Sequence, residues 1–201
     1  MRISYLFNSA VPSHNAGSIQ VVKTCEGLVD DNKEVFLITP DSGLNISMKN
    51  FYDLKFIPKR IKLKYFTEYP KGLKYYLFSI FSVIKAILLK TDLFVTRNLF
   101  TLILLNLFNK KTIIEIHHDL SNEGRLVRFF YKNFDILNSK NILRIVAITN
   151  SVKKFLIKEL KVNKKKIKII PSASSLNFRF KALKRKKKYS IGYFGSLEKS
   201  K

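Results

Sequence analysis

The sequence predicts an α/β domain built around a doubly wound parallel sheet, and three observations support this fold class. Short β-rich runs alternate with longer stretches of helical periodicity along residues 1–172. Most of the β-rich runs are continuously apolar, which is typical of parallel strands that helices cover on both faces. The 201 residues are 46% hydrophobic and 26% charged, so the chain is globular and can bury the core of one Rossmann-like domain.

The position of each element follows from these patterns. Strands are predicted at residues 2–8, 34–39, 51–57, 92–96, 112–116, 143–148 and 167–170. Helices are predicted at residues 18–31, 71–90, 98–108, 125–137 and 151–160, the fourth with aromatic residues on its buried face. Because ligands in this architecture bind beyond the carboxyl ends of the strands, the residues that follow each strand are the candidates for function.

The net charge of +24 is unusually high for a chain of this length. Two explanations stay open: a polyanionic partner, either nucleic acid or an anionic membrane surface, or a lysine-rich composition without functional demand. Residues 184–188 form a basic run of the kind that is more often a solvated surface than a binding site. A recognisable RNA-binding motif is missing, so no nucleic-acid partner is expected.

The sequence also bears on the cellular compartment. Cys25 is the only cysteine and cannot form an intramolecular disulfide, which favours the reducing cytoplasm. The first residues resemble a strand more than a signal peptide. The apolar stretches at residues 75–89 and 99–108 are shorter than the roughly 20 residues that span a bilayer. They predict helices buried against the sheet, with partial insertion at a membrane interface as the alternative.

The loop after the first predicted strand contains Gly17 and Ser18 but not the G-x-G-x-x-G pattern of nicotinamide-dependent enzymes. Glycine lets the backbone approach a ligand closely, and the start of a helix offers free N–H groups to an anion. Gly17 and Ser18 are therefore predicted to bind substrate. The alternative is an ordinary helix start, with Ser18 near the N-cap.

Arg97 directly follows the predicted strand at residues 92–96. Its guanidinium could bind a phosphate or carboxylate group of the substrate through two parallel hydrogen bonds, or it could be an ordinary surface arginine near a helix start. Asn150 follows the strand at residues 143–148 in the same way. We expect Asn150 first to help cap the next helix and second to contact substrate.

The strand at residues 112–116 leads directly into His117, His118 and Asp119. A histidine at this position suits hydrogen bonding to a sugar hydroxyl or to developing charge, since its unperturbed pKa lies near about 6.5. Asp119 could orient one imidazole, or the two histidines could simply be exposed at a turn. Glu115 within the strand is interpreted as a buried structural carboxylate. A metal site is not expected, because one further histidine and one cysteine are too few ligands.

Beyond residue 172 the alternation stops. Residues 173–188 are predicted to be a basic interdomain linker, and residues 189–201 resemble the first strand and glycine loop of a further domain. The chain is therefore expected to be cut at the start of that second domain, which is missing.

The order of these pieces resembles the N-terminal half of a family 4 glycosyltransferase with the GT-B fold. The resemblance rests on the first strand and its glycine-bearing loop, EVFLITP, DLFVTRN, the E-x-H element at residues 115–117, VAITNSVKKFLIKEL, KIKIIPSASS and IGYFGSLEKSK. Residues 172–175 depart from the asparagine–glycine–valine–aspartate usual at the hinge of such enzymes. Ser196 stands where an arginine often follows the glycine of the second-domain loop.

The resemblance implies an N-terminal domain that binds the acceptor, while the missing C-terminal domain holds most of the nucleotide-sugar. Gly17 would lie near the donor phosphates and the acceptor, and Gly195 and Lys201 near the donor phosphates. The catalytic residues would be His117 or, with the register shifted by one, His118, both near the donor sugar. Such enzymes transfer sugar with retention of configuration and need no dedicated metal or other cofactor.

The resemblance also implies a sugar acceptor that is a saccharide or a lipid-linked molecule of the cell envelope, such as lipopolysaccharide. The charge and the apolar helix at residues 71–90 would suit peripheral attachment to the cytoplasmic face of a membrane. A single domain of this kind is expected to be poorly active or inactive. The alternative is a basic module that binds nucleic acid or a membrane surface without catalysis.

Overall fold

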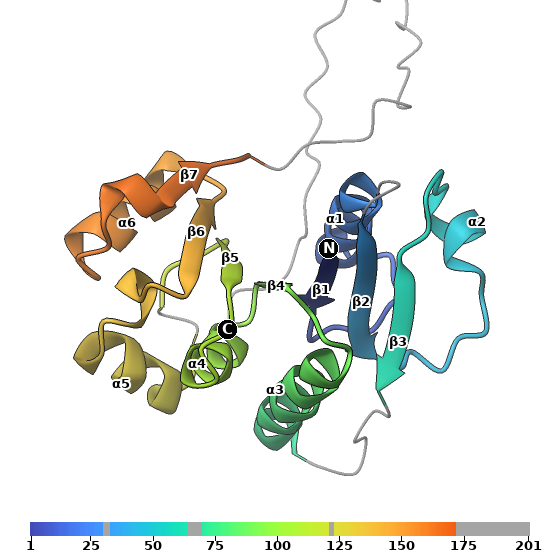
Figure 1. Cartoon of the computed structure of the whole chain (residues 1–201), viewed down its shortest axis with the longest axis horizontal. Coiled ribbons are helices and arrows are strands. Elements are labelled where there is room, and N and C mark those ends of the chain that lie inside the picture. The colour runs from blue at the N-terminus through green and yellow to red at the C-terminus, as the bar shows by residue number, and fades with distance from the viewer. Residues whose placement is uncertain (30–32, 64–69, 121–122, 172–201) are drawn as a thin grey trace, which may run out of the picture.

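The structure, a computed structural model, describes residues 1–29, 33–63, 70–120 and 123–171 (Figure 1). The predicted linker at residues 173–188 and the predicted strand and loop at residues 189–201 lie outside this part. The same holds for Gly195 and Lys201, so their proposed contact with donor phosphates stays a prediction.

Parallel strands form one seven-stranded sheet in the order β3-β2-β1-β4-β5-β6-β7. The strands are β1 (Arg2–Leu6), β2 (Glu34–Pro40), β3 (Lys59–Leu63), β4 (Leu93–Thr96), β5 (Thr112–Ile116), β6 (Ile142–Ala147) and β7 (Ile167–Ile169). β1 lies near the centre, where Tyr5 is in register with Leu37 of β2 and Val95 of β4. The strand order reverses between β1 and β4, as in Rossmann-like domains, so the predicted doubly wound α/β fold is confirmed.

Helices cover both faces of the sheet (Figure 1). They are α1 (Ala16–Leu28), α2 (Met48–Tyr52), α3 (Lys71–Leu88), α4 (Leu99–Leu107), α5 (Arg125–Asn133) and α6 (Asn150–Lys158). Two short 3-10 turns, η1 (Ile136–Asn138) and η2 (Lys164–Lys166), follow α5 and α6. Side chains alternate along a strand, and the core is divided accordingly. Ile3 and Tyr5 pack with the α1 side, whereas Leu6 packs with α3 and α4 on the other side.

The predicted strand at residues 51–57 is wrong. Residues Met48–Tyr52 form the helix α2, and the third strand is β3, whose sequence is KRIKL. Met48 and Tyr52 lie one helical turn apart and both are buried, whereas Phe56 and Ile57 are more than half exposed. β3 is an edge strand, where charged side chains are common. Its lysines and arginine leave no hydrophobic run by which the sequence would predict a strand.

Two predicted helices have different bounds. α5 ends at Asn133 instead of continuing to residue 137, because Phe134 adopts an extended backbone. Tyr131 is its buried aromatic residue, while Phe129 and Phe134 are more than half exposed, so the prediction that its aromatic residues face the core is only partly correct. α1 begins at Ala16, with Asn15 at the N-cap position, which places Gly17 and Ser18 inside the first helical turn.

The division of the core predicts very different effects for two leucines of α4. Leu105 is fully buried, whereas Leu107 is 69% exposed. Replacing Leu105 by alanine should lower the free energy of unfolding by about 2–5 kcal/mol, because it leaves a cavity between helix and sheet. The matched Leu107→Ala variant should change it by less than about 0.5 kcal/mol. Urea denaturation followed by circular dichroism measures both, and equal losses would contradict the described packing.

Candidate functional site

The candidate site lies where the strand order reverses, at the carboxyl ends of β1, β4 and β5. A polar cavity of about 190 Å³ opens there. Its walls are formed by Glu115 of β5, by residues that follow these strands and by residues in or near the neighbouring helices. The full set is Asn8, Tyr75, Arg97, Asn98, Glu115, His117, His118 and Glu123. A ligand crevice is expected at this position, because the connections leave the sheet in opposite directions there.

β5 delivers two of these side chains on one face of the sheet. Glu115 and His117 are two positions apart, so both point toward the α1 side, while Ile114 and Ile116 are buried on the opposite side. The two faces of this strand therefore differ in function: one belongs to the core beneath α4 and α5, and the other presents a carboxylate and an imidazole to the cavity.

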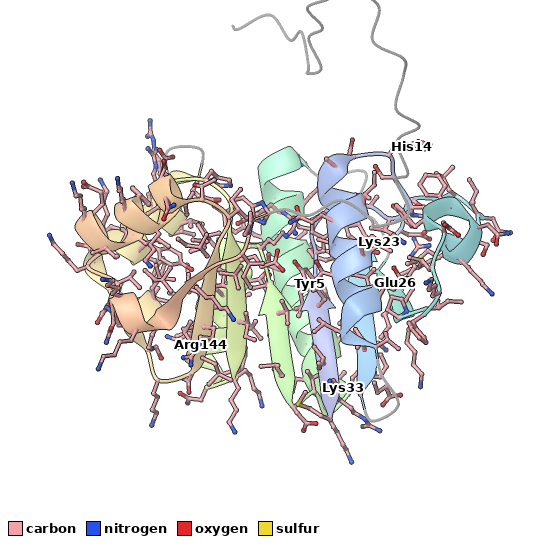
Figure 2. All side chains as sticks on the ribbon, turned by 90° about the horizontal axis from the view of Figure 1, so that it is seen from above. Tyr5, His14, Lys23, Glu26, Lys33 and Arg144 are labelled. Atoms are coloured by element: carbon pink, nitrogen blue, oxygen red, sulfur yellow. The ribbon has the colours of Figure 1, made fainter. Side chains whose placement is uncertain are left out.

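An ion pair between Arg97 and Glu115 forms the centre of the site. Nε and Nη2 of Arg97 each lie 2.7 Å from Oε2 of Glu115, and the two side chains are only 11% and 12% exposed. Arg97 Nε also donates to the hydroxyl of Tyr5 at 3.0 Å. Tyr5 is fully buried on β1 in the middle of the molecule (Figure 2). The pair therefore joins three adjacent strands at their carboxyl ends.

Two further contacts extend this cluster. Nη1 of Arg97 lies 3.5 Å from the carbonyl oxygen of Gly17, which links the end of β4 to the first turn of α1. His117 Nε2 lies 3.4 Å from Oε2 of Glu115. The carboxylate thus orients the imidazole, whose side chain is 24% exposed at the cavity. A histidine held in this way can donate or accept a hydrogen bond toward a bound hydroxyl group.

The protonation state of Glu115 follows from these contacts. Burial alone would raise the pKa of the Glu115 carboxyl, but the hydrogen bond to His117 and the positive charge of Arg97 outweigh it and hold the pKa below its usual value. Glu115 is consequently ionised at neutral pH. Tyr5 shows the opposite behaviour, since burial and then the nearby negative charge of Glu115 raise its pKa.

A second carboxylate, Glu123, lies on the other side of the cavity. Its Oε1 is 3.9 Å from Nε2 of His118, and its pKa is raised by burial, although the positive charge of His118 and the hydroxyl of Tyr75 act in the opposite direction. His118 Nδ1 lies 2.6 Å from the backbone carbonyl of Asp119. The two histidines therefore face different carboxylates, and the cavity lies between an ionised Glu115 and a Glu123 of raised pKa.

The structure brings together some of the predicted site residues. Arg97, His117 and His118 line the cavity, and Gly17 touches Arg97 through its carbonyl. Three other predicted residues that the structure describes are not among those that form its walls: Ser18, Asp119 and Asn150.

Each of these three residues has a different local environment. Ser18 is buried, with its hydroxyl 3.5 Å from the carbonyl of Ala10. Asp119 approaches His118 through its backbone carbonyl. Asn150 is exposed at the first position of α6, where the side chain of Thr149 is the cap and accepts from the N–H of Val152 at 3.2 Å. Their predicted role in substrate binding stays a prediction.

Sequence reasoning missed part of this site. The site residues that the sequence predicts do not include Tyr5, Tyr75 or Glu123, and Glu115 is predicted only as a structural carboxylate. The spacing of Glu115 and His117 on one face of a strand was a visible signal for their proximity. Nothing in the sequence indicates Glu123 or Tyr75, because their position in the cavity depends on where α3 and the segment before α5 pack.

The described part of the chain holds neither a cluster of metal ligands nor a helix that could span a membrane. Within residues 1–29, 33–63, 70–120 and 123–171, no three side chains of histidine, cysteine, aspartate or glutamate converge as metal ligands. In that same part of the chain, no helix combines the length and apolar character needed to cross a membrane.

The Arg97–Glu115 pair predicts a pH-dependent contribution to stability. The pKa of Glu115 is lowered by folding, so its contribution is present above the unfolded pKa of about 4.3 and is lost as the pH falls through the lower folded value. Glu115→Gln should therefore lower the free energy of unfolding by about 3–5 kcal/mol at pH 7, because it leaves the guanidinium buried without a charged partner. The difference from wild type should shrink in acid.

Glu34→Gln is the matched control, because Glu34 forms exposed ion pairs with Arg2 and Lys59 at the opposite end of the sheet. Such exposed pairs contribute little, so this variant should be nearly as stable as wild type. Denaturant titrations at several pH values measure both. A Glu115→Gln deficit that stays constant into acid would show that the lost contribution is not that of an ionised carboxylate.

Several solved structures share this fold. A glycosyltransferase from Rickettsia africae superposes with a TM-score of 0.56 at 16% identity, over 85% of this chain and 43% of that chain. HepE from Anabaena, solved in complex with UDP and glucose, gives 0.58 at 11% identity over 86% and 45%. The lipopolysaccharide outer core galactosyltransferase WaaB gives 0.53 at 13% identity over 89% and 47%. This chain thus spans less than half the length of each of the three.

At these identities the similarity establishes the fold, which is one half of a GT-B glycosyltransferase. A search of curated proteins found no match to the sequence. The model of Glycosyltransferase Family 4, by contrast, matches residues 17–177, a range that includes nearly all of α1, the Arg97–Glu115 pair and both histidines of the cavity. Because this match covers far more than half of the chain, the chain belongs to glycosyltransferase family 4.

Proposed function

We propose that this domain is the acceptor-side half of a retaining glycosyltransferase that moves a sugar from a nucleotide-sugar donor to a saccharide or lipid-linked acceptor. The proposal is carried by one observation: the cavity at the reversal of strand order is lined by Arg97, Glu115 and His117, a preorganised polar cluster, in a family 4 chain. Glycosyl transfer requires polar groups that bind sugar hydroxyls and stabilise charge on the departing phosphate.

His117 is the side chain best suited to a sugar hydroxyl. Glu115 fixes the imidazole from one side at 3.4 Å, and the ring lines the cavity. A preoriented group loses little conformational freedom when it binds a ligand. His118 is the second candidate for the catalytic role, but it is 49% exposed and faces Glu123 at 3.9 Å.

The first turn of α1 is suited to an anionic group. The first hydrogen bond of this turn runs from the N–H of Ile19 to the carbonyl of Asn15. The N–H groups of Ala16, Gly17 and Ser18 precede it and point out of the helix end, and the helix dipole favours negative charge there. A Cβ at Gly17 would meet Phe7 at 3.8 Å, so the proposed contact with donor phosphates or the acceptor depends on these N–H groups and not on the missing side chain. The carbonyl of Gly17 also ties this turn to Arg97.

The donor is best tested first as a uridine nucleotide, because HepE was solved in complex with UDP and glucose. This chain spans less than half the length of that relative, so we expect a uridine nucleotide to bind weakly to this chain. Residues Gly195 and Lys201 stay predicted phosphate contacts. We also propose that the domain by itself transfers little or no sugar.

Saturation-transfer NMR with millimolar UDP-glucose tests the site directly. Wild-type protein should transfer magnetisation to the sugar protons, and His117→Ala should weaken binding by roughly tenfold, because one hydrogen bond to the ligand is lost. His14→Ala is the matched control: His14 packs on Phe51 at 4.6 Å, away from the cavity, near α2 (Figure 2).

Three outcomes decide the matter. Weaker binding for His117→Ala together with unchanged binding for His14→Ala supports the proposed site. Equal effects of the two substitutions would place the ligand elsewhere. Absence of saturation transfer from wild-type protein to UDP-glucose, UDP and glucose alike would overturn the assignment of this cavity to the donor sugar.

A further inference from the structure

The loop between β1 and α1 connects two parts of the candidate site. At one end of the loop Asn8 lines the cavity, and at the other end the first turn of α1 contacts Arg97 through the carbonyl of Gly17. The path of this loop therefore decides where the free N–H groups of that turn point relative to Arg97 and His117. Residues that fix the loop can affect ligand binding without touching the ligand.

α1 has no side-chain cap that would fix this path locally. Asn15 occupies the N-cap position with an extended backbone, yet its side chain makes no hydrogen bond to the first turn. α4 and α6, by contrast, are capped by the side chains of Asn98 and Thr149. Contacts at the N-terminus normally set the direction in which the chain enters a helix. At α1 this direction depends on contacts from other parts of the fold.

Tyr52 of α2 holds the middle of the loop. Its hydroxyl accepts a hydrogen bond from the N–H of Ser13 at 2.7 Å and donates one to the carbonyl of the same residue at 2.9 Å. The side chain is only 7% exposed, and burial raises the pKa of its phenol, so the hydroxyl keeps the proton that it donates. α2 in turn contacts α1 near the β3 edge of the sheet (Figure 1). One hydroxyl thus binds both backbone groups of Ser13.

Arg60 of β3 holds the loop at a second point. Its Nη2 donates to the carbonyl of Val11 and lies 3.9 Å from Oδ1 of Asp41. Val11 is fully buried and forms a parallel bridge with Asp41, the residue that follows β2. The side chain of Arg60 is 11% exposed, and its Nε has no hydrogen-bond partner within the described part of the chain. A buried cation with an unpaired N–H is a poor source of stability, so its position is better explained by the carbonyl that it holds.

We propose that Tyr52 and Arg60 are positioning residues that hold the loop between β1 and α1 so that the first turn of α1 faces the phosphate groups of the donor. Neither side chain is among those that line the cavity, so both act through the backbone of the loop. They come from α2 and β3, the elements that lie beyond β2 at one edge of the sheet. The inference rests on the proposed function, because it concerns the same donor.

Tyr52→Phe removes only the hydroxyl and therefore tests the contact with Ser13. A loop that spends part of its time in other arrangements lowers the apparent affinity by the fraction of molecules that remain competent to bind. In saturation-transfer NMR we expect Tyr52→Phe to weaken binding of UDP and of UDP-glucose alike by about five- to tenfold, the effect of losing one or two net hydrogen bonds. The two ligands should respond equally because the turn faces the phosphates and not the sugar.

Tyr131→Phe is the matched control for this substitution. The side chain of Tyr131 is 6% exposed, and its hydroxyl also donates to a backbone carbonyl, that of Leu99, at 2.9 Å. Leu99 begins α4, which lies on the other side of the sheet from α1 and has its own cap. Tyr131→Phe should therefore bind UDP and UDP-glucose like wild type.

Arg60→Met tests the second contact in the same titrations. It removes the donor to the carbonyl of Val11 but keeps an unbranched apolar side chain, and it should weaken binding of UDP about as much as Tyr52→Phe. Lys62→Met is its matched control, because Lys62 belongs to the same strand and lies 3.7 Å from the same carboxylate oxygen of Asp41. This variant should bind UDP like wild type.

Amide hydrogen exchange separates positioning from overall stability. In Tyr52→Phe the N–H of Ser13 loses its acceptor and should exchange at least about fivefold faster than in wild type. The amide of Leu37, which is fully buried on β2, reports the opening of the core. Its exchange should be the same in Tyr52→Phe as in Tyr131→Phe, since each variant lacks one buried hydroxyl.

Other outcomes overturn the inference. Equal losses of UDP binding in Tyr52→Phe and Tyr131→Phe would trace the effect to stability and not to the loop. Unchanged UDP binding in both Tyr52→Phe and Arg60→Met, or unchanged exchange at Ser13, would show that the loop keeps its path without these contacts. Failure of the proposed function is distinguishable, because wild-type protein itself would then give no signal with UDP or UDP-glucose, and the inference would fail with it.

Discussion

The buried ion pair between Arg97 and Glu115 is the interaction on which the site depends. Two charges with side chains only 11% and 12% exposed are costly to remove from water, so each needs the other in place. The pair forms only if β4 and β5 are adjacent and in register, and Tyr5 of the neighbouring β1 adds a third polar group to it. The same carboxylate then orients His117, and the same guanidinium reaches the carbonyl of Gly17. Fold and site are thus specified by one set of contacts.

The two sides of the sheet have different functions: one presents polar side chains to the cavity, and the other forms the core beneath the helices. On the side of α1, the odd-numbered positions at the end of β5 present Glu115 and His117 to the cavity. On the side of α3, α4 and α5, the even-numbered positions are core, and the helices that cover them are apolar on their outer surface as well.

Much of the fold could be predicted because a parallel sheet covered on both faces leaves a strong signal: β1, β2, β4 and β5 are short, almost continuously apolar runs. β3 could not be found in this way, since an edge strand is partly solvated and KRIKL follows no apolar pattern. The residues of the site likewise fall into those that the sequence predicts and those that it does not. Residues directly after a strand, such as Arg97 and His117, were accessible to reasoning from strand ends alone. Glu123 and Tyr75 were not, because they belong to segments whose position depends on helix packing.

The sequence by itself determined the fold class, the end of the sheet at which function is expected, and the proximity of Glu115 to His117, since the period of a strand is fixed by backbone geometry. Only the tertiary structure decided that Arg97 is satisfied by Glu115 and Tyr5, that the two histidines face different carboxylates, and that the outer side of α3 remains exposed. The physical reason is the same in each case. Partner choice and burial depend on contacts between residues far apart in the chain, and an apolar helix has the same sequence whether a protein, a membrane or water lies against it.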